Sequence, residues 1–468
     1  MPKIAIIGAG PAGLSLARLL NENELHDITV FERSARVGGK VESVEVDGRY
    51  HELGACYLTS GYTRLTPWMK EDGHTFTVLE TFEMDDGKSL QDFIYGDSRI
   101  RAQLHIAKYL ASWVSFHVRE ALGLVSDSEY ARLAKPFGPW LREGGMESMH
   151  RLARRSTVAM GYGFLDQSPR LYGYRWNKPS LIYTGLRKNT REPDLGWSNF
   201  WERLGRRYDL RLEHEVTDLR REGGQVVVEV DRPGADGQTE TVTLPFDHVV
   251  VAVPLTLLAR FTGATDDEKW YADKLVSNRY ATSLVEVDGW FDEPVDTYAY
   301  RERLLPPAQR ENPDEPWDRP LVARRTPRKG GGNRPIYVAY QYVDPQHDPK
   351  TNPEATDASL DERLAAQLRA DLALEGAELK EVIEQRVWDY FPRLSAEGIA
   401  AGGVNRLERM QGIDGVWYSG GSVVLESIDH IVDYNTVLAM RMAHAINGGN
   451  GLLFKVRRAW AAASYHNW

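Results

Sequence analysis

A glycine-rich run near the N-terminus has the residue types and spacing that bind a diphosphate. The run is Gly8-Ala9-Gly10-Pro11-Ala12-Gly13, which lies between the apolar stretch Ile4–Ile7 and apolar residues at helical spacing over 14–20. In such a loop the first glycine allows a tight turn, the second lets backbone approach the phosphates, and the third lets helix and strand pack closely. The helix N-terminus then attracts the negative charge.

An acidic residue follows at the distance that this chemistry requires. Glu32 closes a second apolar stretch, Ile28–Phe31, about 20 residues after the last glycine, where a carboxylate can accept both hydroxyls of an adenosine ribose. Strand, loop, helix, strand and acid together predict a Rossmann βαβ unit from Lys3 to about Gly39. NAD and FAD share this fingerprint, so the choice between them depends on other residues.

The residues after this unit favour FAD. Glu32-Arg33-Ser34-Ala35-Arg36-Val37-Gly38-Gly39-Lys40, followed by Glu52-Leu53-Gly54-Ala55, resembles the E-R-x-x-R-x-G-G-[RK] and D/E-x-G-A segments of the flavin-containing amine oxidase and phytoene desaturase superfamily. The resemblance implies that Gly38, Gly39 and Lys40 follow the diphosphate and ribityl chain, and that Gly54 and Ala55 lie against the flavin. It adds Arg33 to the expected cofactor-binding set.

Two later segments extend the resemblance. In His214–Leu219 the central Val216 is expected to meet the adenine through its backbone. Val416-Trp417-Tyr418-Ser419-Gly420-Gly421, with a helix from about 430 to 445, resembles the closing flavin motif. The superfamily usually has Ala-Gly-Glu in place of residues 419–421, so Gly420 and Gly421 are predicted cofactor contacts on a weaker match.

Three segments resemble the bacterial FAD-dependent polyenoic fatty acid isomerases of this superfamily. They are Val37–Lys40, Gly161-Tyr162-Gly163 with Asp166, and the run from Tyr390-Phe391-Pro392 through Met410-Gln411-Gly412 to Tyr418. The resemblance implies hydride transfer from an allylic carbon to flavin N5 and back to another carbon. No acid or base is then needed, and no catalytic side chain is predicted.

One segment departs from that subfamily. Leu79–Gly87 is acidic where the isomerases offer basic residues to a fatty carboxylate, and acidic residues repel a carboxylate. A small apolar or cationic substrate is therefore expected. The sequence favours an FAD-dependent oxidoreductase that abstracts hydride from a C–H or C–N centre, as in an amine oxidase or desaturase. A redox-neutral double-bond isomerase and a non-catalytic flavin-binding protein are the alternatives.

Four aromatic residues are candidates for the substrate pocket, although each is equally typical of a packed core. They are Tyr57, Tyr162, Trp176 and Trp197. Basic clusters such as 151–155 are expected on solvated faces. With one nucleotide fingerprint and no Cys or His in a flavin-attachment motif, the expected cofactor is non-covalent FAD, reduced by the substrate itself.

Composition narrows the remaining possibilities. The chain has 468 residues and a formal net charge of −10, which gives no general attraction for nucleic acid. The single cysteine, Cys56, excludes an intramolecular disulfide and a multi-thiolate metal site, and fits a reducing cytoplasm. No apolar run approaches the ~20 residues of a bilayer span. No metal is expected, and the oligomeric state is not predicted.

These residues require an α/β fold: a Rossmann-type FAD-binding domain with a parallel sheet, joined to a mixed, amine-oxidase-like substrate lobe of inserted helices and antiparallel sheet. The apolar, non-alternating run 246–254 reads as a further parallel strand. The predicted division is 1–61, 208–265 and 391–450 for the FAD-binding parts, 62–207 for the helical lobe, 266–390 for the antiparallel-sheet lobe, and 451–468 for a C-terminal tail.

Overall fold

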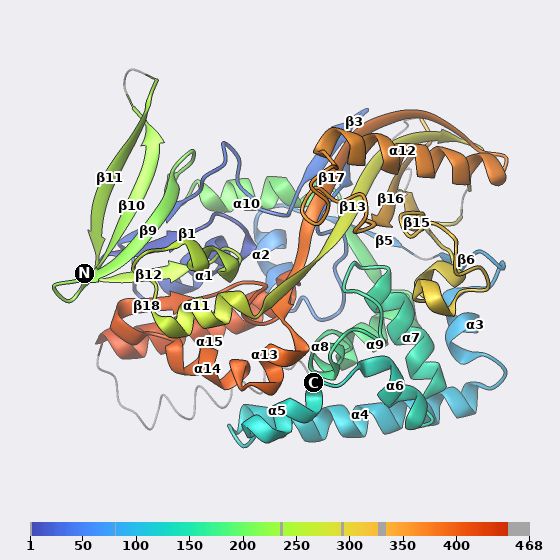
Figure 1. Ribbon diagram of the computed structural model, residues 1–468, viewed down its shortest axis with the longest axis horizontal. Coiled ribbons are helices and arrows are strands. Elements are labelled where there is room, and N and C mark those ends of the chain that lie inside the picture. Colours follow the sequence, from blue (N-terminus) through green and yellow to red (C-terminus); the bar gives the residue numbers. More distant parts are fainter. Residues whose placement is uncertain (1, 80, 235–236, 292–293, 326–333, 448–468) are drawn as a thin grey trace.

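The computed structural model describes residues 2–79, 81–234, 237–291, 294–325 and 334–447. The predicted C-terminal tail 451–468 lies outside these residues. Figure 1 shows a parallel sheet with its helices on the left and a larger lobe of helices and antiparallel sheet on the right.

The parallel sheet has β1 at its centre. Its order is β18-β12-β1-β2-β8, and every neighbouring pair is parallel. The strands are β1 (Ile4–Ile7), β2 (Ile28–Phe31), β8 (Asp209–Arg211), β12 (His248–Val251) and β18 (Val416–Tyr418). All four residues of β1 are buried, as expected for a strand covered on both faces. Segments more than 400 residues apart in sequence therefore meet at one sheet.

Two helices, α1 (Pro11–Glu22) and α15 (Ile428–Asn447), pack side by side against this sheet. Asn435 of α15 donates through Nδ2 to the carbonyl of Ala12 and to the hydroxyl of Ser15, both at 2.8 Å. These contacts join the two ends of the described chain. The predicted helix at 430–445 is confirmed and extends two residues further at each end.

A six-stranded sheet forms the upper part of the second lobe. Its order is β17-β13-β16-β15-β14-β6, antiparallel except for the parallel pair β14 and β6. Its strands are β6 (Phe82–Met84), β13 (Leu275–Asp288), β14 (Thr297–Ala299), β15 (Pro320–Arg325), β16 (Ile336–Tyr342) and β17 (Glu378–Leu394). The amphipathic helix α12 (Asp357–Leu374) covers one face, with Leu364 and Leu368 fully buried.

Helices make up most of the lower part of this lobe (Figure 1). They are α3 (Leu90–Tyr95), α4 (Arg99–Ala121), α5 (Asp127–Leu133), α6 (Phe137–Glu143), α7 (Glu147–Val158), α8 (Arg170–Trp176) and α9 (Pro179–Arg187). The expectation of a helical region is incomplete, because β5 (Phe76–Leu79), β6 and β7 (Thr190–Pro193) also fall within 62–207. The strands that pair with β5, β6 and β7 are distant in sequence, which local periodicity does not reveal.

The smaller elements complete the two parts. The three-stranded sheet β9 (Glu215–Glu222), β10 (Gln225–Pro233) and β11 (Thr239–Phe246) lies beside the parallel sheet, and the antiparallel pair β3 (Ser43–Val46) and β4 (Arg49–Glu52) lies near β17 of the six-stranded sheet. The remaining α-helices are α2 (Leu65–Glu71), α10 (Trp197–Gly205), α11 (Asp266–Asp273), α13 (Ala396–Ala400) and α14 (Gly403–Met410). Although β8 and β9 are neighbours in sequence, β8 joins the parallel sheet, whereas β9 belongs to the three-stranded sheet.

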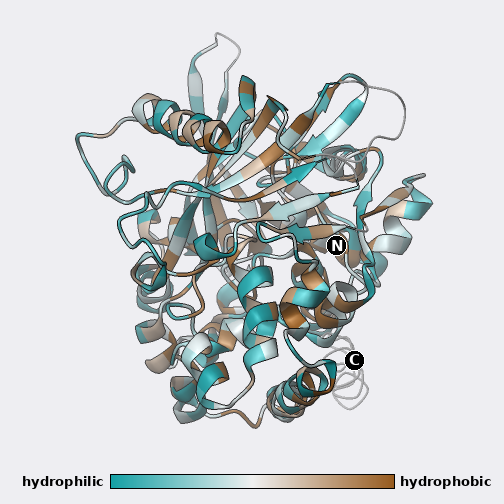
Figure 2. Cartoon of the chain, turned by 90° about the vertical axis from the view of Figure 1, so that its right-hand side faces the viewer, coloured by the Kyte–Doolittle hydropathy of each residue, from teal (hydrophilic) through white to brown (hydrophobic). Residues whose placement is uncertain are grey.

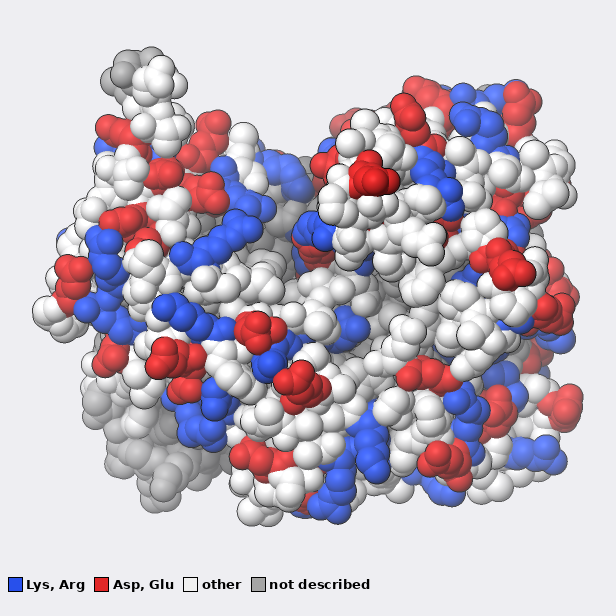
Figure 3. Space-filling model, in the orientation of Figure 1, with Lys and Arg blue, Asp and Glu red and all other residues white. Residues whose placement is uncertain are grey.

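Hydrophobic residues line the strands and one side of many helices, with polar residues on the other side (Figure 2). On the face shown in Figure 3, basic and acidic side chains are interspersed around a central, largely uncharged area. Among the described residues, no helix is long and apolar enough to cross a bilayer.

Candidate cofactor and substrate site

The carboxyl ends of four parallel strands open into one cavity. Gly8 follows β1, Glu32 follows β2, residues 252–254 follow β12, and residues 420–422 follow β18, and all of them line the cavity wall. Ligands of open parallel sheets bind at this edge, outside the carboxyl ends of the strands. The sequence motifs at residues 8–13, 32 and 420–421 are thus brought together by the sheet.

The glycines of the first loop meet two different needs. A Cβ on Gly13 would lie 2.0 Å from the carbonyl oxygen of Gly8, so close packing of helix and strand excludes any side chain. A Cβ on Gly10 would meet only Gly38 and Gly39, at 3.8 Å or more, which is ordinary contact. Protein packing therefore does not demand glycine at position 10. Its bare backbone instead leaves the cavity side open, as the approach of a diphosphate requires.

Glu32 is held in a fixed orientation at the cavity wall. Its carboxylate accepts the backbone N–H of Ala9 and the backbone N–H of Ser34, both at 2.9 Å. Each carboxylate oxygen keeps further acceptor capacity. Because Glu32 lines the cavity and is only 8% exposed, it can accept hydroxyls from a ligand without moving. The site thus fits an adenosine diphosphate group.

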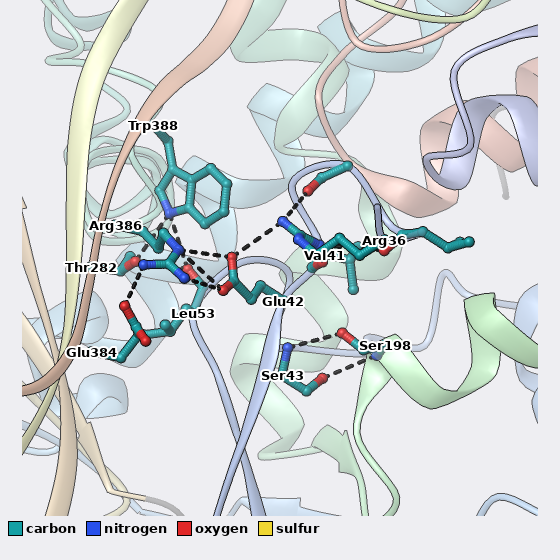
Figure 4. Close-up of polar contacts among 12 residues, drawn as sticks. Arg36, Val41, Glu42, Ser43, Leu53, Ser198, Thr282, Glu384, Arg386 and Trp388 are labelled. Atoms are coloured by element: carbon teal, nitrogen blue, oxygen red, sulfur yellow. Dashed lines mark hydrogen bonds and ion pairs between the residues drawn. The ribbon is translucent and has the colours of Figure 1, made fainter. Parts of the chain in front are cut away.

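A polar network fixes the segment that carries the glycine pair (Figure 4). The Glu42 carboxylate pairs with Arg36 on one side, at 3.2 Å, and with Arg386 of β17 on the other, at 2.8 Å. Trp388, two residues along β17, donates through Nε1 to the carbonyl of Leu53, at 3.2 Å. The second lobe therefore holds Glu42, which follows the 38–40 turn, and Leu53, which precedes the 54–55 turn.

The cavity continues from the strand ends into the helical lobe. Its wall there is mostly apolar and comes from α3, α7 and α9, with Leu90, Leu152 and Leu181 among the lining residues. Most of the predicted site residues lie on this one cavity. Those that line it are Gly8, Gly10, Pro11, Ala12, Glu32, Gly39, Lys40, Gly54, Ala55, Tyr57, Tyr162, Trp176, Gly420 and Gly421.

Three of the predicted aromatic residues line the cavity, and a hydrogen bond holds each of their side chains in place. The Tyr57 hydroxyl lies 3.1 Å from Oγ1 of Thr297, and burial raises its pKa well above the ordinary value. Tyr162 donates to the carbonyl of Glu426 at 2.8 Å, and Trp176 donates to the carbonyl of Ser156 at 3.0 Å. With their polar atoms engaged, these rings present apolar surface to the cavity.

The other predicted residues do not line the cavity. Trp197 is fully buried and donates through Nε1 to the carbonyl of Cys56, at 3.2 Å. This places Trp197 in the core behind the wall rather than in the pocket. Val216 is a buried residue of β9, Arg33 is exposed, and Gly13 and Gly38 shape the loops from outside the cavity.

A cluster of buried charges, missed by the sequence analysis, lies where α15 begins. Lys178 Nζ lies 2.6 Å from the Asp429 carboxylate and 4.0 Å from that of Asp433. His430 donates through Nε2 to the carbonyl of Arg175 at 2.7 Å, while its Nδ1 faces Asp429 at 2.9 Å. Lys178 holds the pKa of Asp429 well below its usual range despite the opposing effect of burial. The partners lie about 250 residues apart, so no local pattern joins them.

Arg155 faces the cavity, where the sequence analysis predicts an exposed residue. The basic cluster 151–155 was expected on a solvated face, but Arg155 is 6% exposed and lines the cavity from α7. The helix turns the arginines in different directions: Arg151 donates to the carbonyl of Ile94, at 3.2 Å, whereas Arg155 faces inward. In the sequence, this difference could be found only from the helical period of α7, which points successive arginines in different directions.

The acidic side chains that the structure describes in segment 79–87 do not line the cavity. Asp86 pairs with Lys88 at 2.9 Å and Arg301 at 3.0 Å, and Asp85 accepts the backbone N–H of Arg301. Among the described residues of this segment, Phe82 lines the cavity. The repulsion of a carboxylate that the sequence analysis assigned to the segment therefore has no support from this geometry. Among the described residues, no group of His, Cys, Asp and Glu could hold a metal ion.

Comparisons with known proteins agree with this arrangement. The chain is 23% identical to a polyenoic fatty acid isomerase of Ptilota filicina over 38% of its own length and 41% of the relative's. It is 24% identical to a 4,4'-diapophytoene desaturase of Staphylococcus aureus over 41% of its length and 33% of the relative's. The chain thus spans less than half the length of these curated relatives.

A solved structure matches over nearly the whole chain. The CLA-producing fatty acid isomerase from P. acnes superposes with a TM-score of 0.76 at 23% identity, covering 94% of this chain and 98% of that one. At this identity the match shows a shared fold. The family model for flavin-containing amine oxidoreductases matches residues 11–395. This chain therefore belongs to the flavin-containing amine oxidoreductase family, whose members carry a flavin.

Proposed function

We propose that this chain is an FAD-dependent oxidoreductase that takes hydride from a C–H or C–N centre of a mostly apolar small molecule. One observation carries the proposal: a single cavity joins the loops at the strand ends to an apolar chamber among the helices. A dinucleotide and a substrate can thus contact each other inside one continuous cavity. Bound FAD supplies the hydride acceptor, flavin N5.

The described residues divide the binding between them. The N-terminus of α1 and the bare backbone at Gly10 receive the diphosphate, and Glu32 receives the ribose hydroxyls. Lys40 lines the same cavity and is ion-paired with Glu426, which fixes its position next to the ring of Tyr390. The start of α15 contributes a partial positive charge at the cavity wall.

Aromatic side chains exclude water from the reacting end. Tyr162 contacts Trp176, with ring centroids 4.6 Å apart, and Tyr390, at 5.6 Å. All three line the cavity. A water-excluding wall protects a transferred hydride from solvent and strengthens electrostatic contacts inside.

The flavin is expected to be held without a covalent bond. Cys56 lines the cavity, but burial raises the pKa of its thiol to about 11. The thiol is then neutral and a weak nucleophile, since the thiolate is the reactive form. Denaturation of the purified yellow protein should release all of its FAD, and flavin retained on the chain would contradict this expectation.

A redox-neutral isomerase is the second candidate, favoured by the likeness to fatty acid isomerases in both sequence and fold. In a net oxidation two electrons leave the substrate at each turnover and must pass to an outside acceptor such as dioxygen. In an isomerisation the hydride returns to the same molecule, so no acceptor is needed. Both reactions use the same cavity.

An anaerobic experiment separates the candidates. Holoprotein is mixed with excess linoleate, a long-chain primary amine or an acyclic polyene, without an electron acceptor. One equivalent of product per flavin, with the flavin left bleached, supports the proposed net oxidation. Many turnovers with the flavin still yellow would establish the isomerase. If no member of a broad panel bleaches the flavin or is converted, the hydride-transfer proposal fails and a non-catalytic role gains support.

A further inference from the structure

Among the described residues that line the apolar end of the cavity, one buried cation, Arg155, has no carboxylate partner. Within the described residues, the Arg155 guanidinium makes no hydrogen bond and no ion pair, and its Nη2 atom is completely buried. A guanidinium remains charged in a protein. A buried charge is expensive unless it is paired.

The surroundings of Arg155 are aromatic. The ring of Phe82 lies 6.0 Å from the guanidinium carbon, and the tyrosine hydroxyls that act on Arg155 belong to Tyr57, Tyr280 and Tyr340. Those hydroxyls already have partners: Tyr57 has Thr297, Tyr280 donates to the carbonyl of Ala159, and Tyr340 accepts from Arg324. Burial lowers the pKa of Arg155, which reflects the cost of keeping this charge dry.

Two other buried cations near the cavity each have a carboxylate partner. Lys178, buried in the same wall, pairs with Asp429, and Arg324, behind the wall, pairs with Glu192. Arg155 has the burial of these two residues but not their carboxylate. The open position beside its guanidinium is the cavity itself, where a ligand can reach it.

The lining around this cation limits what the ligand can be. Leu90, Ile94, Leu152 and Met160 line the same cavity and supply apolar wall. A single guanidinium matches the charge of a monoanion, and a carboxylate can accept a charge-assisted hydrogen bond from it. A dianionic phosphate would require further unpaired donors.

We propose that Arg155 is a substrate-binding residue that pairs with the carboxylate of an apolar, carboxylate-terminated substrate. The inference deepens the proposed function, on which it rests, by naming the substrate class. It also replaces the expectation of a small apolar or cationic substrate, because the described acidic side chains of segment 79–87, which motivated that expectation, do not line the cavity.

The test measures binding rather than turnover. Full-length holoprotein is titrated with linoleate and with linoleyl alcohol, which differ in the charged end, and binding is followed by the flavin absorbance change and by calorimetry. Linoleate should bind at least about tenfold more tightly than the alcohol, because the alcohol leaves the guanidinium unpaired. Arg155→Met should lower linoleate affinity to the level of the alcohol and leave the alcohol affinity unchanged.

Two variants serve as controls. Arg155→Lys keeps the positive charge but not the planar guanidinium, so it should retain part of the preference for linoleate. Arg154→Met removes the preceding arginine of α7, which lies over the Phe93 ring at 5.3 Å and does not line the cavity. It should bind both probes as the unmodified protein does. Flavin content should stay constant throughout.

The outcomes keep this inference apart from the proposed function. Equal binding of both probes, or an Arg155→Met variant that loses affinity for both or for neither, would overturn the carboxylate site even if a neutral substrate is oxidised. Preference for linoleate that depends on Arg155, without any hydride transfer from a broad panel, would support the site while the proposed function fails.

Discussion

At the strand ends of the parallel sheet the cavity wall is largely backbone, whereas in the helical lobe it consists of side chains. The first wall comes from short contiguous motifs such as Gly8–Gly13 and Gly54-Ala55. The second combines Tyr57, Phe82 and Arg155 from three separate elements. A backbone wall fixes the shape of the site, and at Gly54 it leaves no room for an added atom. A wall of side chains can change its chemistry without changing the fold.

The same substitution at both ends should give the largest contrast. A Cβ on Gly54 would lie 1.8 Å from the carbonyl oxygen of Lys40, whereas a Cβ on Gly185, which lines the cavity from α9, would meet nothing within 4 Å. Gly54→Ala must displace the Lys40 segment, at a cost of about 3 kcal/mol or more. Its bound flavin should fall to about a tenth of the normal content, measured as the ratio of flavin to protein absorbance.

Gly185→Ala is the matched control. It adds a methyl group to a helix without steric conflict, so the flavin content should be unchanged and stability should rise by about 0.5–1 kcal/mol. Full flavin content in Gly54→Ala would show that the backbone wall yields to an added atom. The contrast between the two ends would then not hold.

The pH dependence of stability should change when Glu52 is replaced, because this residue is buried between the two regions. Its carboxyl accepts the N–H of Trp197 at 2.9 Å and the hydroxyl of Ser43 at 2.8 Å, yet burial raises its pKa to about 8. A raised pKa stabilises the folded state at low pH, and this contribution is lost as pH rises from about 4.5 to about 8. Glu52→Gln mimics the protonated acid.

Urea unfolding at pH 6 and pH 8 measures this effect. Between these values the unmodified protein should lose up to about 3 kcal/mol through Glu52, and Glu52→Gln should lose correspondingly less. Glu71→Gln, on the exposed end of α2, should behave as the unmodified protein does. A Glu52→Gln variant with the unmodified pH dependence would mean that Glu52 is ionised in the folded state throughout this range.

The same contrast explains what the sequence could predict. The fold class and family follow from motifs in which each residue acts on near neighbours: Gly13 against Gly8, and Glu32 on the N–H of Ala9. Such short-range requirements leave a local pattern in the sequence. The predictions for residues 8–13 and Glu32 can therefore be made from spacing, whereas those for the glycine pair 38–39 and the turn 54–55 come from the family resemblance; the contacts of all of them with a cofactor stay predictions.

The substrate end leaves no such pattern. Arg155 belongs to a basic cluster typical of an exposed helix, and only the packing of α7 against other elements turns it inward. The opposite error occurs at Trp197, which was predicted to line the pocket but lies in the core. The sequence around an aromatic residue is the same whether its ring faces a pocket or the core. Asp86 is likewise ion-paired with Arg301, more than 200 residues away, and Asp85 accepts the backbone N–H of the same residue. These outcomes depend on tertiary contacts that a single sequence does not show.

The smallest expected effect concerns Glu32, where backbone and side chain meet in one site. Glu32→Ala removes the proposed acceptor of the ribose hydroxyls and should weaken FAD binding by about 1–3 kcal/mol, or roughly 5- to 150-fold in Kd. Reconstitution of the apoprotein with FAD and with FMN measures this change, because FMN lacks the adenosine and so never reaches Glu32. The FMN Kd should therefore stay the same. Glu32 also accepts the N–H of Ala9, so an equal loss for both flavins would mean that it shapes the glycine loop and does not hold the ribose. An unchanged FAD Kd would remove Glu32 from the site altogether.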